Sequence, residues 1–76
     1  MDSTSRLITS LAQARGWTVS YASLMASGSG ATVARLRAGH DITTRRAARI
    51  AQWCSDHWPS GHPWPEGIER PTEDAA

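Results

Sequence analysis

The sequence predicts an all-α fold, a compact bundle of four to five short helices followed by an extended C-terminal arm rich in Trp and Pro. Two segments, one around Leu7 and one around Ile50, place apolar residues at the spacings that bury one face of a helix. A third observation is that residues 59–71 hold four prolines and two glycines, which argues against helix or sheet there. The chain therefore divides into a helical domain, residues 1–58, and an arm, residues 59–76.

The first helix is predicted over about residues 5–15. Its apolar face consists of Leu7, Ile8, Leu11 and Ala12. Ser3 or Thr4 is expected to cap its start, because a hydroxyl oxygen can accept from the free backbone N–H groups of the first turn. Gly16 is expected to end it in a left-handed conformation.

Two shorter helices follow around a glycine break. Thr18 is expected to cap a helix over Val19–Ser27, and the glycines of residues 28–30 form a tight turn. The third helix is expected over residues 31–38, closed by Gly39. In this helix Val33 and Leu36 are expected to face inward, and Thr32 and Arg35 to face outward.

The fourth helix is predicted over residues 44–57, with Thr43 as its cap. One stripe of this helix is formed by Ala47, Ile50, Ala51, Cys54 and Trp58. It stops at Trp58 because the residue before a proline avoids the helical region. In the arm, Trp64 and Ile68 are expected to pack onto the domain or onto a partner subunit, and residues 72–76 are expected to fray.

The net charge of +1 conceals a strong asymmetry along the chain. Residues 1–54 hold seven arginines and two acids, whereas residues 55–76 hold one arginine and five acids. There is no lysine, and arginine is the better residue for bidentate contact with phosphate and guanine. Five of the arginines gather around one turn, at Arg35, Arg37, Arg45, Arg46 and Arg49. Such a basic ridge on two short helices is what duplex DNA requires of a small protein.

Several classes of protein are not expected from this sequence. A single cysteine, Cys54, excludes an internal disulfide and fits the cytoplasm, and neither a signal peptide nor a membrane span is recognisable. The spacing of Cys54, His57 and His62 resembles a zinc motif, but the fourth ligand would have to be Asp56 or His40, and Cys54 lies on the predicted core stripe, so no metal is expected. No cofactor or small-molecule ligand is expected either. No ordered catalytic set is present, and we expect no enzyme. Trp53, Trp58 and Trp64 lie outside the basic stretch, which favours packing or subunit contact over base stacking.

The segment Ala31-Thr32-Val33-Ala34-Arg35-Leu36-Arg37-Ala38-Gly39 resembles the recognition helix of the phage-repressor and Cro type of helix-turn-helix domain, the XRE-like group. Ile42 and the run Arg49-Ile50-Ala51 match the helix that follows, and the resemblance covers about residues 5–55. It implies that the second and third helices read DNA, with the third in the major groove, and that a two-fold dimer binds a palindromic operator. The chain departs from the family at two places. The positions of its turn are Ser27 and Gly28, so the usual apolar residue is missing there. At the position of Arg37 the family often has an acid.

The candidate DNA-binding residues are Ser29, Gly30, Ala31, Thr32, Arg35, Arg37, His40, Arg45 and Arg46. Arg35, in mid-helix, is the candidate for reading a guanine edge. Thr32 and Ala31 are candidates for a thymine methyl or a phosphate, although Thr32 could instead cap the helix. Ser29 and Gly30 offer donors to a phosphate at the helix start, or form an ordinary turn.

Arg45 and Arg46 are candidates for phosphate or minor-groove contact, because cations are disfavoured in the first turn of a helix and must have another use. Arg37 either joins this surface or pairs with Asp41, and His40 either contacts a phosphate or has no role. Together these residues predict a sequence-specific, double-stranded DNA-binding transcription regulator, a small dimeric repressor of phage or mobile-element type. The alternatives are a helical module that binds an acidic protein partner and a packaging factor without sequence preference.

Overall fold

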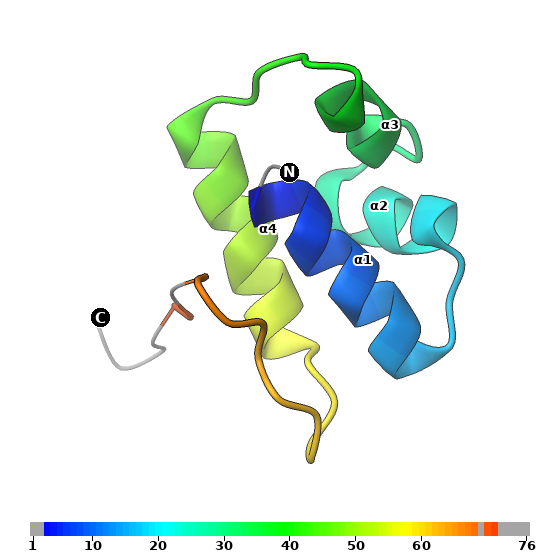
Figure 1. Ribbon diagram of the computed structural model, residues 1–76, viewed down its shortest axis with the longest axis vertical. Helices are drawn as coiled ribbons and strands as arrows, with labels where there is room; N and C mark the ends of the chain where they lie inside the picture. Colours follow the sequence, from blue (N-terminus) through cyan, green and yellow to red (C-terminus); the bar gives the residue numbers. More distant parts are fainter. Residues whose placement is uncertain (1–2, 69, 72–76) are drawn as a thin grey trace.

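Four α-helices joined by short loops make up the computed structural model, which describes residues 3–68 and 70–71 (Figure 1). The helices are α1 (Ser3–Arg15), α2 (Val19–Ser27), α3 (Thr32–Arg37) and α4 (Thr44–Asp56). No β-strand occurs in the described residues, so the all-α prediction is confirmed. The radius of gyration, 11.6 Å, is close to the roughly 11 Å of a folded domain of this length. None of the helices in the described ranges is long and apolar enough to cross a membrane.

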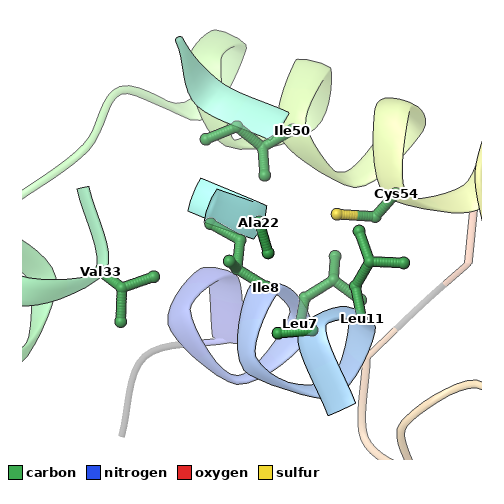
Figure 2. Close-up of a cluster of buried hydrophobic side chains, with 8 residues drawn as sticks. Leu7, Ile8, Leu11, Ala22, Val33, Ile50 and Cys54 are labelled. Atoms are coloured by element: carbon green, nitrogen blue, oxygen red, sulfur yellow. The ribbon is translucent and has the colours of Figure 1, made fainter. Parts of the chain in front are cut away.

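The helix α1 is the centre of the packing, because it contacts each of the other three helices. Its Leu7, Ile8 and Leu11 lie opposite Ile50 and Cys54 of α4 (Figure 2). The core is completed by Ala12 of α1, Ala22 of α2 and Val33 of α3, and all eight side chains are buried. The helices α3 and α4 do not contact each other, and the connector between them arches over one end of the bundle (Figure 1).

The predicted start of α1 is wrong by two residues. The helix already includes Ser3, so Thr4 does not precede it as a cap, and Thr4 and Ser5 are buried. Both residues lie one turn before Leu7 and Ile8, on the face that α1 turns to the core. Their small polar side chains interrupt the apolar pattern in the sequence while occupying the same buried stripe. The end of α1 at Gly16, whose φ is +73°, agrees with the prediction.

The predicted caps of α2 and α4 are confirmed. The Thr18 hydroxyl accepts from the Tyr21 N–H at 3.1 Å, and the Thr43 hydroxyl accepts from the Arg46 N–H at 3.2 Å. Gly28, with φ of +81°, closes α2 by donating its N–H to the Leu24 carbonyl. The bounds of α2 match the prediction, and α4 ends one residue early because His57 is its C-cap.

The segment after α4 turns back along the bundle (Figure 1). Its Trp58, Trp64 and Ile68 are half-buried and pack against the core of the same chain. Three arginines hold this end of the molecule through main-chain carbonyls. Arg6 donates to Glu66, Arg15 donates twice to His57, at 3.1 and 2.6 Å, and Arg70 donates to both the hydroxyl and the carbonyl of Ser55. Residues 72–76, for which fraying was predicted, lie outside the described residues.

Candidate nucleic-acid interface

The helix α3 is one residue shorter at each end than predicted, since Ala31 and Ala38 are its caps. Val33 is buried and Leu36 half-buried, as expected. Thr32, expected to face outward towards DNA, is instead only 8 % exposed. Its hydroxyl lies 2.7 Å from the hydroxyl of Ser27 at the end of α2, and this polar partner inside the bundle is the reason that the side chain turns inward.

A network of hydroxyl groups joins α2 to α3 across the turn. Ser23, which is fully buried, donates to the carbonyl of Ser29 at 2.7 Å, and Ser27 lies within hydrogen-bond distance of the same carbonyl. The Ser29 hydroxyl accepts from the Ala31 N–H at 3.3 Å. These hydrogen bonds fix the approach of α3 to α2. The sequence analysis predicted no role for Ser23, and it considered Ser27 only as a position of the turn where the usual apolar residue is missing.

A hollow of about 560 Å³ separates α3 from the start of α4, where these two helices have no contact. It is lined from α3 by Thr32, Arg35 and Leu36, from the connector by His40, Asp41, Ile42 and Thr43, and from α4 by Arg46. The hollow thus brings together four of the predicted site residues from three parts of the chain. The Arg35 side chain is exposed at this hollow and has no hydrogen-bond partner among the described residues.

A second hollow of about the same volume, 560 Å³, lies between the end of α2 and the first turns of α4. It is lined by Ala26, Ser27, Gly28, Thr43, Arg45, Arg46, Arg49 and Ile50. Arg46 and Thr43 form the shared wall of the two hollows. Arg49, which was not among the predicted site residues, belongs to this surface, and its spacing of four from Arg45 on one helix face is the signal that could have identified it.

The positive charge of this surface is largely uncompensated inside the molecule. The first turn of α4 contains no acid, and Arg45 and Arg49 are like charges four residues apart. Each arrangement is unfavourable by a few tenths of a kcal/mol to about 1 kcal/mol. The side chains of Arg45 and Arg49 have no hydrogen-bond partner in residues 3–68 or 70–71. Arg46 differs, because it donates to the Ser27 carbonyl at 3.3 Å. This surface is therefore cationic, and its exposed Arg45 and Arg49 have no internal counter-charge among the described residues.

The remaining predicted site residues serve the loops and the neighbouring helices. Arg37 donates to the Thr9 hydroxyl of α1 at 3.3 Å, and not to Asp41. The His40 N–H donates to the Arg35 carbonyl and so supports the end of α3. Ser29, Gly30 and Ala31 form the turn before α3, in which the Ala31 carbonyl accepts from the Arg35 N–H. Gly30 and Ala31 are exposed beside α3.

The thiol of Cys54 is part of the core, where burial raises the pKa of Cys54 from 9.0 to about 12. A protonated, buried thiol is neither a nucleophile nor a ready metal ligand. The described residues contain no group of three or more His, Cys, Asp or Glu side chains arranged to hold a metal ion. The candidate functional surface is the arginine-lined surface around the two hollows.

No protein family matches this chain, and no curated protein or solved structure matches it either.

Proposed function

We propose that the chain is a sequence-specific, double-stranded DNA-binding regulator of transcription, a small repressor of phage or mobile-element type that binds its operator as a dimer. In this proposal α3 enters the major groove, and the arginines at the start of α4 bind backbone phosphates. Repression follows from occupancy, because a dimer bound at its operator blocks access of the polymerase.

The observation that carries this proposal is the set of arginines without internal partners on one surface. Arg35, Arg45 and Arg49 are exposed and unpaired among the described residues, while the arginines at the opposite end of α4 hold main-chain carbonyls. Cations without an internal partner favour a polyanionic ligand, and Arg45 also lies in the first turn of α4, where the helix dipole disfavours a positive charge. The turn of four residues with a glycine between α2 and α3, as in helix-turn-helix motifs, favours DNA as that ligand.

The first experiment selects bound sequences from a pool of random duplexes and then titrates the selected duplex at several salt concentrations. Each phosphate contact contributes about −0.9 to the slope of log K against log salt. Contacts by Arg45, Arg46 and Arg49 alone predict a slope of roughly −3 for one subunit. A slope near zero contradicts the proposal, and a two-fold symmetric consensus supports the dimer.

The second experiment asks whether Arg35 reads a base. A bidentate contact to guanine is worth about 1–3 kcal/mol of discrimination. Arg35→Ala and Arg35→Lys are both expected to lose preference for the selected duplex over random DNA, because lysine keeps the charge but not the planar fork. Arg45→Lys is the matched control and should keep this preference. If Arg35→Lys also keeps it, Arg35 contacts only the backbone.

A further inference from the structure

The outer face of α2 is apolar. Of the large hydrophobic side chains in the described residues, three are exposed, Tyr21, Leu24 and Met25, at 46 %, 49 % and 44 %. They stand at positions i, i+3 and i+4 of one helix and therefore share one face. Trp17 extends this face, because its ring meets that of Tyr21 edge-on with 5.0 Å between centroids. These four residues form a single surface, the α2 patch.

The size of the α2 patch is close to that of the largest apolar patch on a typical monomer, about 300–600 Å². Nearly half of each of three large side chains amounts to roughly 250 Å² of apolar surface, before the contribution of Trp17. Contiguous patches of a few hundred Å² on a small monomer are commonly binding sites. An interface of standard size buries about 800 Å² per partner, so the patch would form the apolar centre of a small interface.

The charges around the α2 patch indicate its partner. The helix α2 itself contains no charged residue. Near its start, the guanidinium of Arg15 lies 5.6 Å from the centre of the Trp17 ring. At its end, Ala26, Ser27 and Gly28 share a hollow with Arg45 and Arg49. The outer face of α2 is therefore apolar, and arginines lie beside both ends of this helix.

This charge pattern disfavours a second copy of the chain as the occupant. A two-fold contact of α2 against α2 brings arginines against arginines in either direction, whether the two helices run parallel or antiparallel. Like charges facing each other in an interface oppose association. Carboxylates at both ends of an apolar helix face would complement the patch instead.

We propose that the α2 patch binds an amphipathic helix of another protein that carries apolar residues at spacings of three and four and carboxylates at both ends. Helices of this kind pack their apolar stripe onto an exposed helix face, and charges at the rim set orientation and association rate. The patch lies outside the α3 surface proposed to read DNA bases, so loss of base reading and loss of peptide binding can be measured separately, although Arg45 and Arg49 border both surfaces.

The test uses two synthetic helical peptides of about 15 residues with the same leucines. One has glutamates at both ends, and its twin has lysines there. The acidic peptide is expected to shift the NMR signals of α2, to bind more weakly as salt rises, and to bind at least tenfold more tightly than the lysine twin. Equal binding of the twins, or no binding of the acidic peptide at millimolar concentration, overturns the proposal.

Variants of the protein locate the site. Leu24→Glu and Met25→Glu are each expected to weaken binding of the acidic peptide at least tenfold. Gln13→Glu, which places the same charge on an exposed position of α1, is expected to leave it unchanged. Circular dichroism should be the same in all three variants, and DNA affinity should fall much less than peptide affinity. If Leu24→Glu weakens DNA binding as strongly as peptide binding, or converts a dimer into a monomer in sedimentation, the patch has a different occupant and the proposal is wrong.

Discussion

Thr32→Val separates a structural role of Thr32 from a role in DNA contact. Valine keeps the shape of the side chain and replaces the hydroxyl with a methyl group, so no cavity is created and only the hydrogen bond is lost. The hydroxyl lies 2.7 Å from that of Ser27, and the residue is 8 % exposed. A buried neutral hydrogen bond contributes about 0.5–1.5 kcal/mol to stability. We therefore expect the free energy of unfolding to fall by about 1 kcal/mol, and the melting temperature by roughly 4–8 °C.

The measurement is urea denaturation of the wild type, Thr32→Val, Ser27→Ala and the double variant. If the two hydroxyls bond to each other, the losses are not additive, and the coupling energy is at least about 0.5 kcal/mol. DNA affinity, measured well below the melting temperature, should change little. The reasoning is refuted if Thr32→Val leaves the stability unchanged and weakens DNA binding, because the hydroxyl then faces the DNA.

Three further predictions concern α4 and the segment after it. Arg45→Ala and Arg46→Ala should weaken DNA binding alike. Only Arg46→Ala should lower the free energy of unfolding, by about 0.5–1 kcal/mol, because only Arg46 donates to the Ser27 carbonyl. Equal stability of the two variants in urea would contradict this. Trp64→Ala should lower the free energy of unfolding by about 2–3 kcal/mol. The half-buried ring packs on the core, donates to the Ile68 carbonyl at 2.8 Å and lies under Arg70. A loss below about 0.5 kcal/mol would show that the segment after α4 is not anchored. The unfolded chain loses the Cys54 proton near pH 9 and the folded chain near pH 12. The free energy of unfolding should therefore fall between pH 9 and pH 12, by up to about 4 kcal/mol. In Cys54→Ala the free energy of unfolding should fall less steeply with pH.

The sequence predicted best where the determinants are local. The bounds of α2 follow from Thr18 and Gly28, whose hydrogen bonds reach only three or four residues along the chain. The start of α1 was missed because Thr4 and Ser5 are small enough to be buried although they are polar. Periodicity of apolar residues alone does not identify such positions.

The orientation of the candidate site residues depends on contacts between helices, and the sequence predicted these contacts less well than the bounds of the helices. Helical spacing placed Thr32 and Arg35 outward, but the Ser27 hydroxyl, which turns Thr32 inward, belongs to another helix. In the same way, the pattern did not distinguish Arg46, with its bond to the end of α2, from the unbonded Arg45 beside it. A sequence pattern reports which residues share a face of one helix, and not which partner that face will meet.

The arginines of this chain therefore form two groups with different physical roles. At one end of α4, Arg15 and Arg70 use the planar guanidinium to donate two hydrogen bonds each, and this fixes the segment after α4 against the core. Around α3 and the start of α4, Arg35, Arg45 and Arg49 have no such partner in the described part of the chain. Substitution in the first group should lower stability and reduce binding only through unfolding, whereas substitution in the second should reduce binding at constant or higher stability. A domain of this size has few kcal/mol of stability in reserve, so DNA affinities of variants are comparable only when the folded fraction of each is measured.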